Sequence, residues 1–317
     1  MKLLYFGQEV WEEEYITQRL PGMSVEFRLG SLSQATMAGS DADALSVFVN
    51  STVGATQLDL FPRLKHIATR STGFDHIDLT EAARRGISVS SVPSYGVNTV
   101  AEFAFALLLA LVRNVREANQ RVTEGSLEQS RLTGIDLYGK TIGIIGCGRI
   151  GACAVQIAKG FGMEVVVYDA FENTELATKL GFTYIPLDEL LSRSDVISIH
   201  APYTADTHHL INSTNISKIK RGAYLINTAR GALVESGALL AALNDGTLGG
   251  AGLDVLEHEH DLQDPTNRAL ISHRAVLVTP HVGFDTVEAI KRILDTTIEN
   301  ILAFEQGTPK NLVMLAN

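Results

Sequence analysis

The stretch Gly139–Asp169, GKTIGIIGCGRIGACAVQIAKGFGMEVVVYD, decides the fold of this chain. Its apolar, β-branched run Thr141–Ile145 predicts a buried strand, which stops at three glycines with the spacing G-x-G-x-x-G. Apolar residues then recur at helical spacing over Ala152–Phe161, and Gly162 is expected to end that helix. A second strand is predicted over Val165–Tyr168. The stretch is therefore a strand–turn–helix–strand unit that closes on an acidic residue.

The three glycines, Gly146, Gly148 and Gly151, have the spacing that a dinucleotide requires. Gly146 permits the tight turn off the strand, Gly148 leaves room for a pyrophosphate beside the backbone, and Gly151 lets the helix pack closely on the strand. The unpaired N–H groups at the start of the helix attract the phosphates. Together with the intervening Arg149 and Ile150, the glycines form the expected cofactor-binding turn.

Asp169 predicts which dinucleotide binds, because it lies 18 residues after Gly151 at the end of the second strand. A carboxylate at this position accepts hydrogen bonds from the adenosine ribose and repels a 2′-phosphate. Ala170 and Phe171 follow it, and no arginine or lysine is near enough in the sequence to hold such a phosphate. The sequence therefore predicts NAD rather than NADP.

The length and composition are typical of a globular protein with two domains. A chain of 317 residues, 45% hydrophobic and 20% charged, is too long for one ordinary core. Its net charge of −10 disfavours nucleic acid and anionic membrane as partners. The longest apolar run, Phe103–Val112, is shorter than a membrane span, and Met1–Phe6 shows no signal-peptide pattern. Cys147 and Cys153 are expected to be free thiols in the cytoplasm, with a redox switch at the cofactor loop as the alternative.

Strands and helices alternate along the rest of the chain, which predicts parallel sheets covered by helices. In the first hundred residues, strands are predicted at Leu3–Phe6, Val25–Leu29, Leu45–Val49, His66–Thr69 and Ile87–Val92, and helices at Glu9–Leu20, Ser31–Ala38, Thr56–Phe61 and Leu79–Arg85. Beyond them we expect one long helix at Thr99–Gln120, strands at Asp195–His200, Ala223–Asn227, Gly250–Val255 and Ala275–Thr279, and a last helix at Val287–Gln306. The tail after this helix is expected to return to the first domain.

Three further stretches carry polar residues at the ends of predicted strands. They are Leu225–Gly231 (LINTARG), Gly250–Glu259 (GAGLDVLEHE) and Val278–Phe284 (VTPHVGF). Doubly wound sheets bind their ligands outside the carboxyl ends of the strands. We therefore expect all three stretches to open toward the cofactor.

These motifs resemble those of the D-isomer-specific 2-hydroxyacid dehydrogenases, and most of all those of the D-lactate dehydrogenases in that family. Two further stretches share the resemblance, Arg70–Asp78 (RSTGFDHID) and Val92–Glu102 (VPSYGVNTVAE). The resemblance covers nearly all of the chain. It implies an α/β fold of two doubly wound parallel-sheet domains, in which a Rossmann NAD-binding domain, residues 99–286, is inserted into a flavodoxin-like substrate domain, residues 1–98 and 287–317. It also implies a homodimer joined through the nucleotide domains.

The resemblance assigns the catalytic roles to Arg230, Glu259 and His281. A planar guanidinium can hold the carboxylate of a 2-oxo acid and polarise its carbonyl, and an imidazole can protonate the carbonyl oxygen during reduction. A carboxylate beside the imidazole favours its charged form. In the family this glutamate lies five residues after the aspartate of the second stretch, Asp254, which selects Glu259 rather than Glu257. Each residue alone has an ordinary structural explanation, but their occurrence at three strand ends favours catalysis.

Further roles follow from the same resemblance. Asp254 is expected to face the nicotinamide, and the backbone N–H groups of Thr72 and Gly73 to bind the substrate carboxylate. Tyr95 and Phe284 match positions where D-lactate dehydrogenases place rings around a small substrate side chain, which favours pyruvate. Alternatively, Phe284 packs the interdomain cleft, and the segment between the catalytic glutamate and histidine is shorter than in many D-lactate enzymes.

Two other functions remain open from the sequence. One is a glyoxylate or hydroxypyruvate reductase of the same family, and the other is an NAD(H)-sensing binding protein similar to the C-terminal-binding transcriptional corepressors. The pairs His208–His209 and His258–His260 could suggest a metal, but no third ligand is spaced with them, so no metal site is expected. His260 also stands where the family often has proline.

Overall fold

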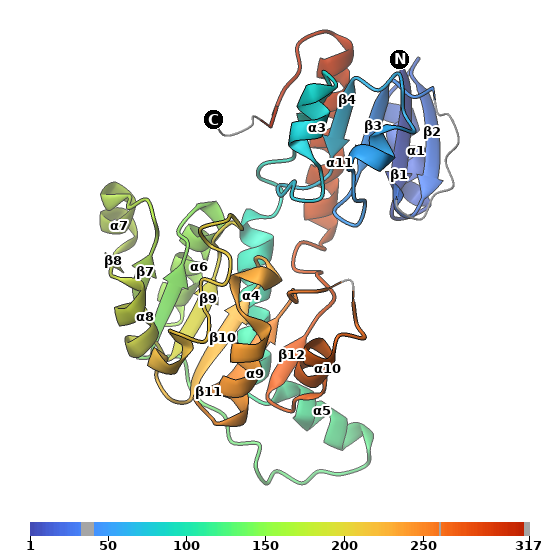
Figure 1. The fold of residues 1–317 in the computed structure, drawn as a ribbon. Helices are drawn as coiled ribbons and strands as arrows, with labels where there is room; N and C mark the ends of the chain where they lie inside the picture. Colours follow the sequence, from blue (N-terminus) through green and yellow to red (C-terminus); the bar gives the residue numbers. More distant parts are fainter. Residues whose placement is uncertain (33–40, 260, 314–317) are drawn as a thin grey trace. The chain divides into compact units, whose positions relative to one another are not determined.

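The computed structural model describes residues 1–32, 41–259 and 261–313, and the chain divides into two compact units (Figure 1). Unit 1 consists of Met1–Tyr95 and Thr286–Asn317, and unit 2 consists of Gly96–Asp285. Each unit contains one parallel sheet with helices. The predicted α/β class with two parallel sheets is confirmed.

Unit 1 is built on a five-stranded sheet with the flavodoxin-like order β2-β1-β3-β4-β5. Its strands are β1 (Lys2–Gly7), β2 (Ser24–Leu29), β3 (Ala44–Val47), β4 (His66–Thr69) and β5 (Ser88–Ser90). Its helices are α1 (Trp11–Arg19), α2 (Ala55–Leu58), α3 (Leu79–Arg84) and α11 (Val287–Glu305). The central strands β3 and β4 are buried throughout, because helices cover both faces of a parallel sheet. After α11 the chain returns to β5, where Val313 N donates to Val89 O at 2.8 Å.

The first helix of unit 1 begins two residues later than predicted, for a reason visible in the hydrogen bonds. The N–H groups of Gln8 and Glu9 donate to the carboxylate of Glu12, at 2.7 and 2.9 Å, so these residues form a turn ahead of α1. The strand predicted to reach Val49 ends at Val47. The helix predicted at Ser31–Ala38 falls largely outside the described residues.

Unit 2 is built on a seven-stranded parallel sheet with the order β12-β11-β10-β9-β6-β7-β8. Its strands are β6 (Thr141–Ile145), β7 (Glu164–Tyr168), β8 (Thr183–Tyr184), β9 (Val196–Ile199), β10 (Ala223–Asn227), β11 (Leu248–Leu253) and β12 (Val276–Val278). Its helices are α4 (Val97–Val112), α5 (Val115–Thr123), α6 (Arg149–Gly160), α7 (Thr174–Leu180), α8 (Leu187–Arg193), α9 (Ser236–Asn244) and α10 (Pro265–Ser272), with short 3-10 turns at Ile216–Lys218 and Gly231–Leu233. The strand order reverses between β6 and β9, which is the point where doubly wound sheets bind ligands.

The single helix predicted at Thr99–Gln120 is wrong, because the chain forms two helices, α4 and α5, that meet at 62°. The break lies at Asn114, which has a left-handed backbone with φ +52° and donates its side-chain amide to the carbonyls of Leu132 and Thr133. Asparagine tolerates this conformation better than most residues.

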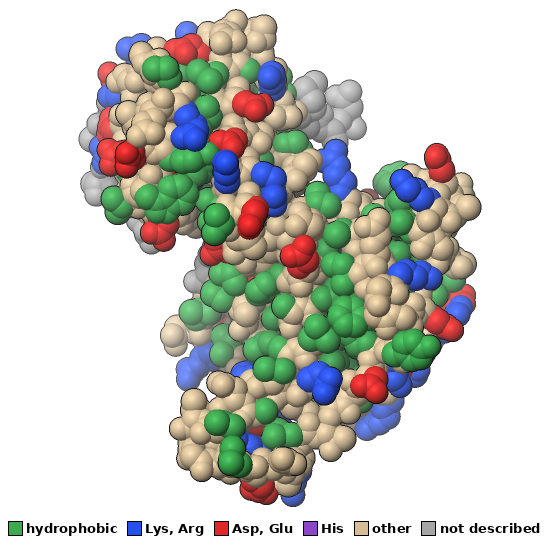
Figure 2. Space-filling model, turned by 180° about the vertical axis from the view of Figure 1, so that it is seen from behind, with side chains coloured by type: hydrophobic (Ala, Val, Ile, Leu, Met, Phe, Trp, Pro, Cys, Tyr) green, Lys and Arg blue, Asp and Glu red, His purple; other side chains and the backbone are tan. Residues whose placement is uncertain are grey.

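No single helix of the described residues is long and apolar enough to cross a membrane, although this bent pair reaches that length and composition when taken together. Hydrophobic side chains also gather on the face of unit 2 shown in Figure 2.

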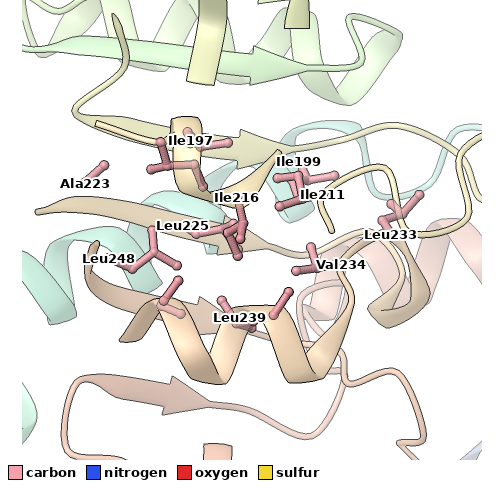
Figure 3. Close-up of a cluster of buried hydrophobic side chains, with 14 of the residues drawn as sticks. Ile197, Ile199, Ile211, Ile216, Ala223, Leu225, Leu233, Val234, Leu239 and Leu248 are labelled. Carbon is pink, nitrogen blue, oxygen red and sulfur yellow. The ribbon is translucent and has the colours of Figure 1, made fainter. Parts of the chain in front are cut away.

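Apolar packing fixes the helices on both faces of the sheet of unit 2. On one face, Ile197, Leu225 and Leu248 of three neighbouring strands pack with Leu239 of α9 (Figure 3). On the other face, α4 packs so closely on β11 that a Cβ atom at Gly252 would lie 3.1 Å from side-chain atoms of the helix. Interdigitated packing of this kind holds the strands and their ends in fixed positions.

A buried histidine makes the stability of unit 1 sensitive to acid. His66 of β4 is fully buried, its ring nitrogens contact the hydroxyls of Ser88 and Ser90, and its ring stacks on Phe304 with the centroids 4.3 Å apart. Burial lowers its pKa from 6.5 to about 4. Below pH 6.5 the unfolded chain therefore binds a proton that the folded protein does not bind until the pH approaches 4.

We expect the wild type to lose about 3 kcal/mol of unfolding free energy through His66 as the pH falls across this window. The variant His66→Gln has no titrating side chain at this position and should lose correspondingly less. Denaturant unfolding of both proteins at about pH 7.5 and about pH 4.5 measures the difference. Equal losses in the two proteins would contradict the assignment.

Candidate active site

Three of the predicted polar stretches meet at one edge of the sheet in unit 2. β10, β11 and β12 are neighbouring parallel strands, and their last residues are partners in register. Arg230 follows the end of β10, Asp254 follows the end of β11, and His281 follows the end of β12. The N–H of Asp254 donates to the carbonyl of Asn227, the last residue of β10, at 2.9 Å. The three stretches therefore begin side by side.

Asp254 holds the turn that carries His281. The side chain is 2% exposed, and its Oδ1 accepts hydrogen bonds from Thr279 Oγ1 at 2.6 Å and from Val282 N at 2.9 Å. Its Oδ2 accepts a third from Gly283 N at 2.7 Å, and the N–H of His281 donates to the Asp254 carbonyl at 2.9 Å. Burial raises the pKa of the carboxyl, although these donors and the nearby histidine pull it down. The buried carboxylate is thus the centre of the turn.

The backbone of this turn is strained at the histidine. His281 has φ +56°, a left-handed conformation that residues other than glycine seldom adopt. Such strain costs about 1–3 kcal/mol and persists only where the surroundings impose it. A Cβ atom at Gly283 would lie 2.8 Å from Asp254 Oδ2, so glycine is needed for the carboxylate to approach. The turn therefore fixes the backbone from which the imidazole projects.

His281 and Glu259 form a pair. Glu259 Oε1 lies 3.3 Å from His281 Nδ1, and the two side chains are about one third exposed or less, at 33% and 27%. A carboxylate at Nδ1 orients the imidazole. Because Nδ1 makes this contact, Nε2 is the ring nitrogen available for proton transfer to a substrate oxygen.

Arg230 stands in a turn that is shaped by its neighbours. The side chain of Asn227 spans the turn, donating to the Arg230 carbonyl at 2.9 Å and accepting from the N–H of Ala229 at 3.0 Å. A Cβ atom at Gly231 would lie 2.0 Å from the carbonyl carbon of Leu256, so the turn packs directly on the segment after β11. Arg230 is half-buried at this position, and its Nη1 donates to the Ala229 carbonyl at 2.8 Å.

The other glutamate of this segment, Glu257, is held elsewhere. Its Oε1 lies 2.5 Å from His209 Nε2, and its Oε2 accepts from the N–H of Ser236 at 3.1 Å. Burial alone raises the pKa of Glu257, but the hydrogen bonds from His209 and Ser236 bring it below its ordinary value. Of the two glutamates, only Glu259 faces His281, whereas Glu257 ties its segment to the loops after β9 and β10.

Of the histidine pairs noted in the sequence, the first consists of two stacked rings. His208 stacks on His209, with the ring centroids 3.8 Å apart. Within the ranges that the structure describes, no group of three or more His, Cys, Asp or Glu side chains is arranged to hold a metal ion. His260 lies outside the described residues.

The glycine turn after β6 fits a dinucleotide. Gly146 has φ +87° and packs against Ala201, and a Cβ at Gly151 would lie 2.1 Å from the Gly146 carbonyl oxygen. Gly148 is different, because its φ of −69° suits any residue and a Cβ there would meet nothing within 4 Å in the described chain. Neither backbone strain nor packing explains this glycine. The open space beside it, at the start of α6, fits a pyrophosphate.

The acid expected to bind the ribose is tied to the same turn. Asp169 Oδ2 accepts from the N–H of Cys147 at 2.6 Å, and its Oδ1 accepts from the N–H of Phe171 at 2.9 Å. Arg149 and Ile150 form the exposed and half-buried start of α6. Burial, and then the charge of Asp169, raise the pKa of the Cys147 thiol to about 11. This thiol therefore stays protonated near neutral pH, which disfavours a redox role.

Two buried polar atoms at the same edge of the sheet have no partner among the described residues. They are Thr228 Oγ1, just after β10, and His200 Nδ1, just after β9. Burial lowers the pKa of His200 to about 4, so its imidazole is neutral. Buried polar groups are nearly always hydrogen-bonded in native proteins. A ligand at the carboxyl ends of β9 and β10 would supply the missing partners.

The remaining predicted residues belong to different units. Thr72, Gly73 and Tyr95 lie in unit 1, whereas Phe284 lies in unit 2, three residues after His281. The backbone N–H groups of Thr72 and Gly73 donate to no group in the part of the chain that the structure describes. They are thus able to bind an anion.

A buried ion pair that the sequence pattern did not reveal lies just before the turn that contains Thr72. Arg70, 2% exposed, contacts Glu12 with Nη1 and Oε2 2.6 Å apart, and Tyr5 donates its hydroxyl to the same oxygen at 2.8 Å. Arg70 also donates to the carbonyl of Phe6. The two charges are 58 residues apart in the chain, so their pairing appears only in the folded unit. A possible signal in the sequence was an arginine directly after an apolar strand.

Residues 105–283 match the family model described as "D-isomer specific 2-hydroxyacid dehydrogenase, NAD binding domain". The chain belongs to this family. The predicted family and the NAD cofactor are confirmed, and unit 2 carries the NAD-binding domain. The chain is accordingly an NAD-dependent D-2-hydroxyacid dehydrogenase, and its substrate is a small hydroxy or oxo acid.

Relatives of two kinds are similar to this 2-hydroxyacid dehydrogenase. A D-lactate dehydrogenase of Escherichia coli is 36% identical over 99% of this chain and 100% of its own, and a glyoxylate reductase of Korarchaeum cryptofilum is 40% identical over 86% of this chain and 83% of its own. Among solved structures, D-lactate dehydrogenase from Aquifex aeolicus complexed with NAD and lactic acid has a TM-score of 0.88 and 36% identity, covering 97% of this chain and 96% of its own. The substrate is therefore not decided by these likenesses.

Gly148→Ala tests whether the open space beside this glycine is the cofactor site. We expect NADH to bind about tenfold more weakly or worse, because a methyl group would occupy the space needed by the pyrophosphate. The folded protein should keep its melting temperature, since nothing within 4 Å would contact the methyl group. NADH fluorescence titration and thermal unfolding measure the two effects.

Gly160→Ala is the matched control, because Gly160 ends the same helix and a Cβ there also meets nothing within 4 Å in the described chain. This variant should bind NADH like the wild type. Equal NADH affinity in Gly148→Ala and Gly160→Ala would remove Gly148 from the cofactor site.

Proposed function

We propose that this protein is a D-lactate dehydrogenase that reduces pyruvate with NADH to D-lactate. The observation that carries the proposal is the contact between Glu259 and His281, on a turn that Asp254 holds in a strained conformation. A histidine so fixed, with a carboxylate at one nitrogen, is suited to deliver a proton to one defined position. The guanidinium of Arg230 stands after the end of β10, on the other side of β11 from β12 in the sheet.

The roles of the side chains follow from the chemistry of a 2-oxo acid. When bound, NADH supplies the hydride that adds to the carbonyl carbon. Arg230 holds the substrate carboxylate and polarises the carbonyl with its planar fork of N–H donors. His281 gives the proton from Nε2 to the carbonyl oxygen, and Glu259 stabilises the imidazolium before that transfer. In the opposite direction His281 accepts the proton as a base.

The residues proposed to contact the substrate favour a small acid. The N–H groups of Thr72 and Gly73, which donate to no group among the described residues, are suited to the carboxylate, and the rings of Tyr95 and Phe284 are suited to a methyl group. The match to D-lactate dehydrogenases over nearly the whole length of both chains supports pyruvate. We assign the role of the substrate domain to unit 1. The limits expected for this domain from the sequence are residues 1–98 and 287–317.

A glyoxylate or hydroxypyruvate reductase is the second candidate, because a glyoxylate reductase is 40% identical to this chain. The third candidate is an NAD(H)-sensing binding protein on the same scaffold, which would bind NADH without turnover.

We also propose a homodimer joined through unit 2. Its apolar side chains Val115, Val122 and Leu127 are 52%, 57% and 83% exposed, and hydrophobic side chains gather on the face of this unit shown in Figure 2. Exposed apolar patches often mark contacts between protein chains.

The free thiols of Cys147 and Cys153 fit a reducing compartment, and we propose the cytoplasm as the location.

A panel of 2-oxo acids assayed with NADH and NADPH, with chiral analysis of the product, tests the proposed function. We expect pyruvate to have the highest kcat/KM, D-lactate to be the product, and NADH to be preferred because Asp169 repels a 2′-phosphate. A higher kcat/KM for glyoxylate or hydroxypyruvate would identify the second candidate instead. NADH binding without turnover of any 2-oxo acid would favour the sensing protein.

A further inference from the structure

Asn267 of α10 lies behind the segment that carries Glu259. It is fully buried, and its Nδ2 donates to the carbonyl oxygens of His258 at 2.9 Å and of Asp261 at 3.1 Å. These two carbonyls stand on either side of Glu259 in the sequence. One amide group therefore bridges the two ends of the short loop on which this glutamate stands.

The orientation of the amide follows from its partners. A side-chain amide carries two N–H donors on its nitrogen, and carbonyl oxygens only accept, so the nitrogen must face both carbonyls. The amide oxygen, Oδ1, is buried and has no partner within the described part of the chain. Leaving such a group unpaired is unfavourable, and an apolar residue of the same size would avoid this cost. The two donors are thus the useful part of Asn267.

The helix that carries Asn267 is itself fixed to unit 2. Asp264 caps its start, with Oδ1 accepting from the N–H groups of Thr266 and Asn267 at 2.9 Å each, and Pro265 occupies the first turn. Leu270, one turn further on, is fully buried in the same apolar cluster as Leu225 and Leu239. Between the end of β11 and Pro265, the described residues 254–259 and 261–264 form turns and irregular backbone. The loop is therefore attached through Asn267 to a rigid element.

We infer that Asn267 is a positioning residue for the reaction, which acts by holding the Glu259 carboxylate at Nδ1 of His281. Neither the sequence motifs nor the proposed mechanism assigns it a role, and it touches no reacting atom. The inference rests on the proposed function of Glu259. Without the two donors, the loop would keep its attachment to β11 but would sample other conformations, and the 3.3 Å contact between Glu259 and His281 would be made for less of the time.

Asn267→Leu tests the inference, because leucine has a similar size and can remain buried without donors. With pyruvate, or with glyoxylate if that acid proves the better substrate, we expect kcat to fall about tenfold or more while the KM and the affinity for NADH change little. Asn267→Asp, which keeps the shape but places an oxygen against two carbonyls, should have at least the same effect on kcat if it folds. Ser272→Ala, on the exposed side of the same helix, is the control and should match the wild type.

A double-mutant cycle with Glu259→Gln separates positioning from general stability. If Asn267 acts through Glu259, Asn267→Leu should have little further effect on kcat in the Glu259→Gln background, because the two losses share one cause. Fully additive losses would overturn the inference, since they would show that Asn267 acts by another route.

Amide hydrogen exchange provides a readout that does not depend on activity. Asn267→Leu should speed exchange in residues 256–264 and leave the rest of unit 2 unchanged. Unchanged exchange in this segment would overturn the inference even if the enzyme is active on pyruvate. A wild type that turns over no 2-oxo acid would instead reject the proposed function, and a positioning role for Asn267 with it, whatever the exchange shows about the loop.

Discussion

The buried carboxylate of Asp254 is the interaction on which the site depends. It accepts three hydrogen bonds from the turn after β12, while its own backbone continues directly from β11. A buried charge is costly unless donors compensate it, and here the donors are the groups that define the turn. The left-handed backbone of His281 is a consequence of this arrangement. Removing the carboxylate would therefore loosen the whole turn, in addition to removing a hydrogen-bond acceptor.

Similar buried polar groups hold the other loops at the same edge of the sheet. Asn227 shapes the turn of Arg230, Glu257 joins three loops through His209 and Ser236, and Asn267 bridges the loop of Glu259. The strands beneath them are rigid because both faces of the sheet are covered by packed helices. Reactive side chains thus stand on loops, but each loop is fixed by hydrogen bonds to a neighbour. The strands supply a rigid base, and the hydrogen bonds between loops supply the precise placement of the reactive side chains.

The sequence allowed the α/β class, the family and the glycine turn to be predicted, because these depend on local spacing and on apolar runs. The break at Asn114 could not be predicted, since no glycine or proline marks it and it depends on the carbonyls of Leu132 and Thr133. The pair of Arg70 with Glu12 and the role of Asn267 were also missed. Both join groups that are distant in sequence or carry no motif, and only folding brings such partners together. That Asp254 faces the nicotinamide stays a prediction, and within the chain its side chain contacts the histidine turn.

The single-turnover rate of NADH oxidation by pyruvate in Asp254→Asn, compared with Thr279→Val, tests the central claim most directly. An asparagine cannot accept all three hydrogen bonds, whereas Thr279→Val removes only one of them. At saturating NADH we expect the rate to fall about tenfold or less in Thr279→Val and about a hundredfold or more in Asp254→Asn. A wild-type rate in Asp254→Asn would contradict the account, because the turn of His281 would then not depend on the buried carboxylate.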